Sequence, residues 1–374
     1  MNEMPARKVD ALIIGGGIIG LAIGYYLARR NFCNVEIIER ESAVTMHASG
    51  HNAGGLSGIH ASHPRSLWPL YRRSQQLYSE LAESSGFDFD YARIGSLVPG
   101  SVEVEKDFES TAREFEDGKE GVEVEFLGRD DLQNKEPNLS KHRFSCALYY
   151  PLDAQGNSLK LGRSFAGSCL EKGIKITTGC KVTGFEVSAS RVTSVKTDRG
   201  TYDPGIVILA AGPWSGEVSA RLGLDIPVSP IKGHLITINT AGVRLVKSFI
   251  SGPNYYVMQN SSEVIVGGGE DPSGFNTLVD QTRINEAWSE GISMVPILGS
   301  YEKSPSIRTA CLRPYAKDGI PIIGASRRLS NVLFATGHFR TGFGLAPITG
   351  MLISELIVDG RSSMDLSAFS PDRF

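Results

Sequence analysis

Short apolar runs alternate with amphipathic stretches at both ends of the 374-residue chain. Residues 9–14 and 35–38 are mostly apolar and predict two buried strands, and residues 21–30 between them predict a helix. Near the C-terminus the pattern returns, with a strand predicted at 332–336 and a helix at 346–356. Strands that alternate with helices are typical of an α/β fold with a parallel sheet.

The middle of the chain has further predicted strands, and from 227 to 313 apolar and polar positions alternate, which favours antiparallel strands there. The expected strands lie at 95–100, 147–150, 175–178, 181–188, 191–198, 201–202, 206–211, 233–239, 255–259 and 263–267. Strands 191–198 and 201–202 form a hairpin around Arg199-Gly200. Helical spacing predicts helices at 68–84, 159–172 and 281–294, whereas 102–131 is charged and partly helical and 47–63 is a loop.

A chain of this length exceeds what one hydrophobic core usually fills, so we expect two domains. The order of elements predicts an α/β fold in which a discontinuous, Rossmann-like nucleotide-binding domain is interrupted twice by a second domain. Residues 1–88, 148–224 and 316–374 would form the nucleotide-binding domain. Residues 89–147 and 225–315 would form a mainly antiparallel-sheet substrate domain.

The first predicted strand ends in a glycine motif, Gly15-Gly16-Gly17-Ile18-Ile19-Gly20. Gly15 permits a tight turn, Gly17 lets the backbone approach a pyrophosphate, and Gly20 lets the following helix lie close to the strand. The second strand ends at Glu39, where a carboxylate accepts hydrogen bonds from a ribose diol and would repel a 2′-phosphate. The pattern therefore favours a dinucleotide without a 2′-phosphate over an ordinary glycine-rich turn.

Composition excludes several other classes of protein. The net charge is −3 without a long basic run, which argues against a nucleic-acid surface. The five cysteines lack C-x-x-C spacing, so neither a disulfide framework nor a metal site is predicted. No apolar stretch reaches the ~18 residues of a transmembrane helix. The first residues are too polar for a signal peptide, so we expect a cytoplasmic protein.

Four motifs together resemble the D-amino acid oxidase superfamily of flavoproteins, and most closely its glycine oxidase and sarcosine oxidase type. They are the fingerprint with Glu39, the loop 48–56, the segment VILAAGPWS at 207–215, and the tail at 311–324 and 333–350. The tail, CLRPYAKDGIPIIG followed by LFATGHFRTGFGLAPITG, is the most specific of the four. The resemblance covers nearly the whole chain and implies FAD, because this family uses the fingerprint for the ADP half of that cofactor.

The resemblance and the glycine pattern imply a set of residues around FAD. This set is Gly15, Gly17, Ile18, Ile19, Gly20, Glu39, Arg40, Ser49, Gly50, His51, Asn52, Ala53, Gly54, Val182, Ala211, Gly212, Trp214, Gly342, Phe343 and Gly344. The glycine-spaced loop 337–344 enters a helix, so its N–H groups would face the negative edge of a reduced flavin. Alternatively, these glycines only let the helix pack on the sheet.

His51 lies where some members of the family carry a histidine bonded covalently to the flavin. Glycine oxidases have no histidine at that position and bind FAD non-covalently. A histidine that forms a hydrogen bond in the flavin pocket is favoured here, and covalent attachment stays open.

Candidate substrate-binding groups lie in the second half of the chain. In the family the arginine of the R-P motif holds the substrate carboxylate, and Arg313 matches it. Arg340 matches a second family position near the substrate. A tyrosine on the 255–259 strand contacts the substrate in the family, which gives Tyr255 or Tyr256, and we expect Tyr255.

These features predict an FAD-dependent amino-acid oxidase or dehydrogenase that takes a hydride from the carbon next to nitrogen of a small or N-substituted amino acid. The partners would be that amino acid, O₂ or another electron carrier, and possible further copies of the chain.

The strand at 263–267 lacks the lysine that sarcosine oxidases carry near the flavin. One alternative is a 2-hydroxy-acid dehydrogenase with His60 or His51 as general base, because the loop containing Gly58-Ile59-His60 resembles that of L-2-hydroxyglutarate dehydrogenases. Another is a non-catalytic FAD-binding subunit or a tRNA-modifying module.

Overall fold

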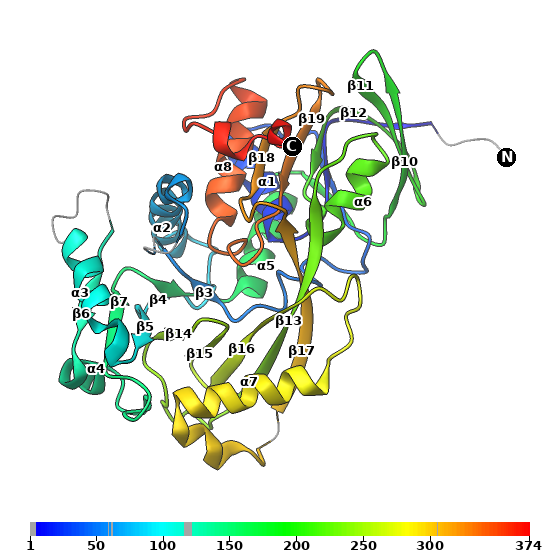
Figure 1. Cartoon of the computed structure of the whole chain (residues 1–374). Coiled ribbons are helices and arrows are strands. Elements are labelled where there is room, and N and C mark those ends of the chain that lie inside the picture. Colours follow the sequence, from blue (N-terminus) through cyan, green and yellow to red (C-terminus); the bar gives the residue numbers. More distant parts are fainter. Residues whose placement is uncertain (1–4, 59, 61–62, 116–121, 305) are drawn as a thin grey trace.

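The computed structural model describes residues 5–58, 60, 63–115, 122–304 and 306–374. Two large sheets lie one above the other in Figure 1, the upper one next to helices α1, α5 and α8 and the lower one next to helix α7. A third, small sheet pairs β3 (Gly55–Leu56) with β8 (Ala154–Gln155) and β8 with β4 (Ala92–Arg93). The α/β fold class predicted from the sequence is confirmed.

The upper sheet contains the nucleotide fingerprint. Its strands run in the order β10 (Val182–Ser188), β11 (Arg191–Thr197), β12 (Gly200–Leu209), β1 (Arg7–Ile14), β2 (Val35–Ile38) and β9 (Lys175–Thr177). Strand β19 (Val332–Thr336) also pairs with β12 in parallel, and β18 (Ile322–Ala325) pairs with β19. Strands from three distant parts of the chain therefore form one parallel core.

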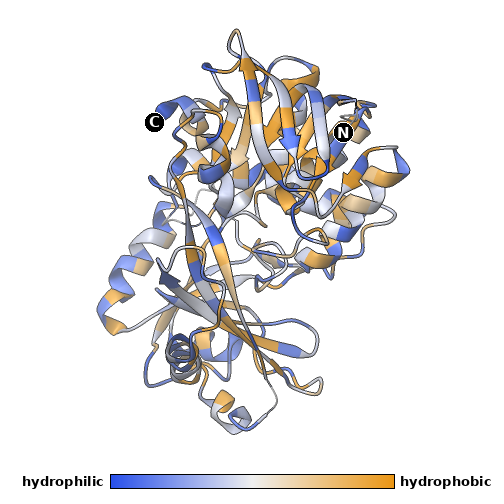
Figure 2. Ribbon diagram, turned by 90° about the vertical axis from the view of Figure 1, so that its right-hand side faces the viewer, coloured by the Kyte–Doolittle hydropathy of each residue, from blue (hydrophilic) through white to orange (hydrophobic). Residues whose placement is uncertain are grey.

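Both faces of this sheet are buried, which explains the continuous apolar runs in the sequence. In β1, Ala11 and Ile13 pack in the core on one face, whereas Leu12 and Ile14 pack in a separate core on the other. Figure 2 shows the hydrophobic residues along these strands and the helices beside them.

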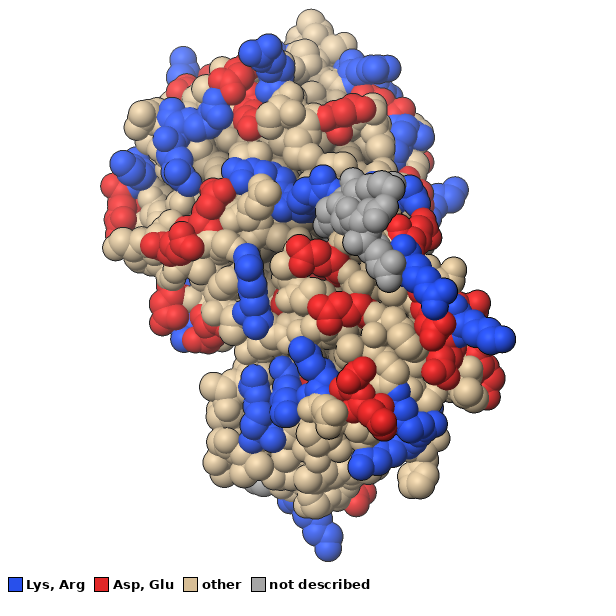
Figure 3. Space-filling view, turned by 90° about the vertical axis from the view of Figure 1, so that its left-hand side faces the viewer, with Lys and Arg blue, Asp and Glu red and all other residues tan. Residues whose placement is uncertain are grey.

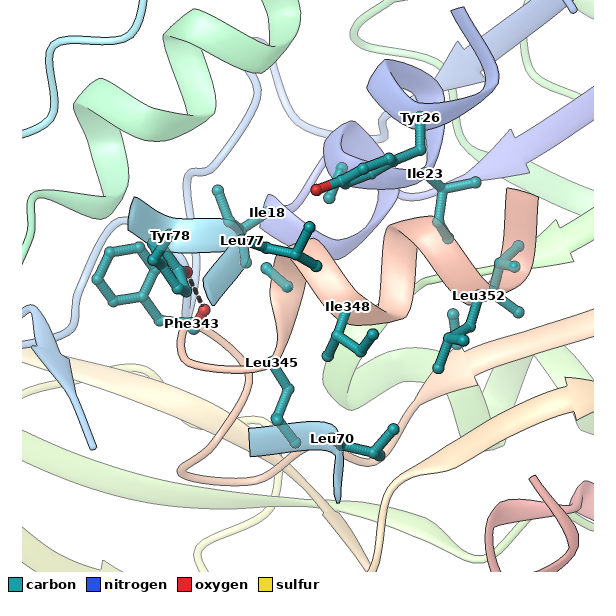
Figure 4. Close-up of a cluster of buried hydrophobic side chains, with 14 of the residues drawn as sticks. Ile18, Ile23, Tyr26, Leu70, Leu77, Tyr78, Phe343, Leu345, Ile348 and Leu352 are labelled. Atoms are coloured by element: carbon teal, nitrogen blue, oxygen red, sulfur yellow. Dashed lines mark hydrogen bonds between the residues drawn. The ribbon is translucent and has the colours of Figure 1, made fainter. Parts of the chain in front are cut away.

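The helices on the first face are α1 (Ile18–Arg29), α5 (Ser158–Glu171) and α8 (Ala346–Val358), with α2 (Trp68–Ala82) packed against α8. Figure 4 shows α1, α2 and α8 meeting through Ile18, Leu77 and Ile348. A glycine permits the close approach of two of these helices, because a Cβ at Gly350 of α8 would lie 2.7 Å from the Ala22 carbonyl oxygen of α1.

The lower sheet has the strand order β17 (Ser306–Ala316), β13 (Val228–Asn239), β16 (Glu263–Asp271), β15 (Tyr255–Gln259), β14 (Phe249–Ser251), β5 (Ser96–Gly100), β7 (Cys146–Tyr150) and β6 (Glu125–Leu127). Helix α7 (Gln281–Met294) packs on one face of it. The remaining helices are α3 (Glu105–Glu114), α4 (Arg129–Lys135) and α6 (Ser215–Ala220). Single 3₁₀ turns lie at Arg65–Leu67, Val102–Val104, Gly212–Trp214, Pro296–Tyr301, Ser367–Phe369 and Pro371–Arg373.

Some element boundaries differ from the sequence predictions. The predicted strands at 201–202 and 206–211 are one strand, β12, since Pro204 pairs with Val9 in the β1 ladder and does not interrupt it. Strands β13 and β16 extend beyond the predicted 233–239 and 263–267, and the three-residue strand β14 was not predicted. The division of the chain into two domains at the predicted boundaries stays a prediction.

Candidate active site

A cavity of about 940 Å³ lies between the upper and lower sheets. It is lined by the fingerprint turn, by residues between 45 and 57 together with His60 and His63, by residues between 210 and 221, by one face of the lower sheet, and by the loop 338–344. These segments are far apart in the sequence. The fold therefore makes one continuous space from the end of β2 to the start of α8.

The fingerprint turn is held in shape by close packing. Gly15 has a φ of 120°, and a Cβ there would lie 2.3 Å from the Ala210 carbonyl oxygen. Gly20 does not line the cavity, and a Cβ there would lie 2.0 Å from the Gly15 carbonyl oxygen. These two positions therefore require glycine because the backbone itself comes close.

Glu39 turns its carboxylate back toward the fingerprint. Its Oε2 accepts a hydrogen bond from the Gly16 N–H at 2.7 Å, and its Oε1 accepts one from the Glu41 N–H at 2.9 Å. Each carboxylate oxygen can accept a second bond, so both oxygens stay available to a ribose diol. The position at the cavity wall is the one expected for this role.

The loop after β2 lies against the start of α1. The Ile18 N–H donates to Ser49 Oγ at 2.9 Å, which caps the helix from a distant residue. Asn52 donates to the Ser49 carbonyl oxygen at 2.8 Å and accepts from the Gly54 N–H at 2.8 Å. Gly50 packs away from the cavity, since a Cβ there would lie 2.2 Å from the Thr45 carbonyl oxygen.

At the opposite end of the same loop, three side chains pack together beside the end of β2. The Arg40 guanidinium lies 3.6 Å from the centre of the Trp214 ring, and the His47 ring lies 4.5 Å from that ring. Glu41 pairs with both Arg40 at 2.9 Å and His47 at 2.8 Å. His47 holds the pKa of Glu41 below its usual value.

The loop before α8 presents free backbone amides to the cavity. Within the described chain, the N–H groups of Gly342, Phe343 and Gly344 have no hydrogen-bond partner, and all three residues line the cavity. Helix α2 fixes this loop from behind, because Tyr78 donates to the Phe343 carbonyl oxygen (Figure 4) and Ser74 to that of Gly344 at 2.5 Å. Oriented amides at a helix start suit an anionic ring edge.

Of the predicted cofactor residues, all line this cavity except Gly20 and Gly50, which shape the turns behind it. Their arrangement fits an FAD molecule. The acid that suits a ribose, the glycine turn that suits a pyrophosphate and the amides that suit a flavin edge follow one another along a single space.

The register of the lower sheet fixes which residues face the cavity. Tyr256 lies opposite Gly267, and Gly267 lies opposite Leu235. Opposite residues in antiparallel strands share a face, so these three side-chain positions point the same way. Tyr256 and Leu235 line the cavity, as do Phe249, Cys311 and Arg313 from the same face.

The predicted orientation of Tyr255 toward the cavity is therefore wrong. Tyr255 lies opposite Gly268, whereas Tyr256 lies opposite Gly267. Its side chain packs under α7, where its hydroxyl donates to Glu286 at 3.4 Å. A shift of one residue exchanges the two faces of a strand. Tyr256 is the tyrosine in the cavity.

Arg313 is almost completely buried, with 9% of its surface exposed, and it lines the cavity. Its Nη1 donates to the Gly269 carbonyl oxygen at 2.8 Å. Two glycines make room for this site. A Cβ at Gly233 would lie 2.0 Å from Arg313 Nη2, and one at Gly267 would lie 2.7 Å from the Tyr256 hydroxyl.

Arg340 enters the same region from the loop before α8. Burial and the charge of Arg313 lower its pKa, and both guanidinium groups lie beside the Phe339 ring, at 6.0 Å (Arg313) and 5.5 Å (Arg340) from its centre. Burial raises the pKa of Tyr256 to about 12, against the opposing effect of both arginines. The three side chains thus meet at one end of the cavity.

A buried imidazole network lines another part of the wall. His60 Nε2 lies 2.6 Å from Asp153 Oδ2, which also accepts a hydrogen bond from Ser96 at 2.6 Å. The His60 ring stacks on Tyr150 at 4.0 Å and on His63 at 5.1 Å. Burial lowers the pKa of His63 to about 4. The sequence offered His60 only as a possible base, and the neighbouring Ile59 lies outside the described residues.

The fold and this cavity are those of a nucleotide-dependent redox enzyme, and a family comparison gives the class. Residues 10–356 match the family described as FAD dependent oxidoreductase, so the chain belongs to that family and FAD is its cofactor.

Relatives agree with this assignment. The chain is 28% identical to the glycine oxidase of Geobacillus kaustophilus, covering 98% of this chain and 97% of the relative. It is 27% identical to the hydrogen cyanide synthase subunit HcnC of Pseudomonas protegens, with the same coverage of each chain. The crystal structure of the Geobacillus kaustophilus glycine oxidase superimposes with a TM-score of 0.90 at 26% identity, over 99% of this chain and 100% of that one. No helix among the described residues is long and apolar enough to cross a membrane.

Proposed function

We propose that this enzyme oxidises the carbon next to nitrogen in a small or N-substituted amino acid, giving an imine that hydrolyses in water. The observation that carries the proposal is Arg313, an almost fully buried guanidinium facing the FAD cavity with no carboxylate partner among the described residues. A buried cation without a counter-charge is costly unless a ligand supplies the charge. A substrate carboxylate fits that need.

The relatives support an amino-acid substrate, since several of them are named glycine oxidase. They do not support the alternative of a 2-hydroxy-acid dehydrogenase.

Acidic and basic side chains are interspersed over the molecular face in Figure 3, without a large region of one sign. The electron acceptor is O₂ or another carrier.

The roles of the residues follow from their positions. When bound, FAD supplies the hydride acceptor, and the amides of Gly342, Phe343 and Gly344 face the charge that reduction creates. Arg313 holds the substrate carboxylate, and Tyr256 donates a hydrogen bond to it. Both side chains fix one end of the substrate, which orients its α-carbon.

The test is a panel of amino acids scored by anaerobic bleaching of the bound flavin. The variant Arg313→Ala should raise the apparent KM for the best substrate at least about 30-fold, because losing a charge-assisted clamp costs ~2–5 kcal/mol. An unchanged KM would remove the carboxylate role from Arg313. A wild-type flavin that no amino acid bleaches would overturn the proposed reaction.

A further inference from the structure

Two guanidinium groups share the substrate end of the cavity, but their surroundings differ. Arg340 Nη2 forms an ion pair with Glu270 Oε1 at 2.7 Å. Arg313 donates instead to a neutral carbonyl oxygen, that of Gly269, at 2.8 Å. In the described part of the chain Arg313 has no ion-pair partner. The formal charge of Arg313, Arg340 and Glu270 together is therefore +1.

Both contacts come from one short segment at the end of β16. The carbonyl group of Gly269 holds Arg313, and the side chain of the next residue, Glu270, holds Arg340. Gly268 and Gly269 have φ values of 144° and 71°, which only glycine adopts readily, so the strand bends here. The Gly269 N–H donates to the Asn254 carbonyl oxygen at 3.0 Å and fixes the bend. Arg340 lines the cavity, whereas Glu270 does not.

We infer that Glu270 is a specificity-determining residue that restricts the site to substrates with a single carboxylate. This inference rests on the proposed function, in which Arg313 binds the substrate carboxylate. Glu270 supplies the counter-charge of Arg340 from outside the cavity, so that only one guanidinium is left for a ligand anion. A second carboxylate on the substrate would have to compete with Glu270 for Arg340.

The solvent exposure of the Arg340–Glu270 ion pair sets how strongly the Glu270 charge should affect ligand affinity. The side chains of Arg340 and Glu270 are 40% and 51% exposed, so water weakens the attraction between them. Removing the Glu270 charge should therefore change the affinity for a second carboxylate by roughly 2- to 5-fold. The affinity for a single carboxylate, held by Arg313, should change less than about two-fold on the same grounds.

The experiment compares two ligands that carry no amine and cannot react, propionate and succinate, by calorimetry on the FAD-loaded enzyme. In Glu270→Gln, succinate should bind roughly 2- to 5-fold tighter than in the wild type, with propionate nearly unchanged. The matched control is Glu286→Gln, which removes a half-exposed carboxylate paired with Arg283 on the α7 side of the same sheet. It should leave both affinities unchanged.

A double variant tests whether the effect of Glu270→Gln on succinate binding depends on the charge of Arg340. In Glu270→Gln combined with Arg340→Met, the gain for succinate should disappear, because the released guanidinium is gone. If Glu270→Gln is folded and the ratio of the two affinities equals the wild-type ratio, Glu270 does not set specificity. If Glu270→Gln fails to fold, Glu270→Ala replaces it, with the same expected gain for succinate and with an unchanged ratio of the two affinities as the result that would overturn the inference.

The failure of the underlying proposal would look different. In that case propionate would bind wild type and Arg313→Ala equally, or would bind neither. If propionate binding depends on Arg313 but the succinate affinity is the same in Glu270→Gln and the wild type, the role of Glu270 is rejected and the proposed function still stands.

Discussion

Tyr255 and Tyr256 are adjacent on β15, yet only Tyr256 has its side chain in the cavity. The variant Tyr256→Phe should raise the apparent KM for the substrate by roughly 10-fold or more, since a hydrogen bond to a charged group contributes ~1.5–3 kcal/mol. Tyr255→Phe removes a hydroxyl that contacts Glu286 on the opposite face, and steady-state kinetics should show no more than a two-fold change in KM. A larger effect from Tyr255→Phe would contradict the assignment.

Gly233 is a second single residue on which the substrate site depends, because it has no side chain to displace Arg313. A methyl group there would lie 2.0 Å from Arg313 Nη2, so Gly233→Ala should displace the guanidinium from its seat. We expect a KM increase approaching that of Arg313→Ala with an unchanged circular dichroism spectrum. Gly184→Ala in β10 is the matched control, because a Cβ there meets nothing within 4 Å. Equal kinetics for both alanine variants would show that Arg313 tolerates the displacement.

Among the elements, the loop before α8 carries a histidine, His338, whose titration affects stability. His338 is buried and its Nε2 lies 3.0 Å from Thr349 Oγ1, one turn into the helix. Burial lowers its pKa to about 3, below the value of 6.5 in the unfolded chain. The unfolded state therefore takes up the proton first. This contribution to stability is complete above pH 6.5 and is lost as the pH falls toward 3.

Between pH 7 and pH 5 the wild type should lose roughly 2 kcal/mol of unfolding free energy through His338, at about 1.4 kcal/mol per pH unit below 6.5. Urea denaturation of His338→Gln should show a pH-dependent loss smaller by that amount. The exposed His142 provides the control variant, His142→Gln, whose pH dependence should match the wild type. The prediction fails if His338→Gln and the wild type lose the same free energy.

The elements that the sequence predicted well are those whose pattern is local. The bounds of β15, β19 and α7 agree with the predictions, because β15 and β19 are short, mostly apolar runs and α7 has apolar residues at helical spacing. The face that Tyr256 presents depends instead on the register between β15 and β16, which no local pattern specifies. The ion pair between Glu270 and Arg340 joins residues 70 positions apart, and neither residue has a sequence signal that points to the other.

At the scale of the whole molecule, the cofactor cavity exists only because distant segments meet. Strands β1, β12 and β19 lie side by side in the upper sheet (Figure 1), and each leads into a segment that lines the cavity. The lower sheet closes the same space from the other side. The fingerprint at the N-terminus and the loop before α8 are thus two ends of one binding site, although more than 300 residues separate them in the sequence. A ligand that contacts all of these segments binds the folded chain and not the unfolded one.

FAD should therefore stabilise the enzyme as a whole, by about 2.7 kcal/mol when its free concentration is 100 times its Kd. Glu39→Gln removes the carboxylate that suits the ribose and leaves one neutral acceptor oxygen for the two N–H groups of Gly16 and Glu41. We expect the Kd for FAD to rise by roughly 10-fold, the loss of a hydrogen bond to a charged group, and the FAD-dependent increase in Tm to shrink accordingly. Flavin fluorescence quenching gives the Kd, and thermal unfolding with and without FAD gives the shift. Glu186→Gln, which removes a surface carboxylate paired with Lys196 in β11, should change neither quantity. If Glu39→Gln bound FAD as tightly as the wild type, the ribose would have to lie away from Glu39, and the path of the cofactor along the cavity would be wrong from its adenosine end onward.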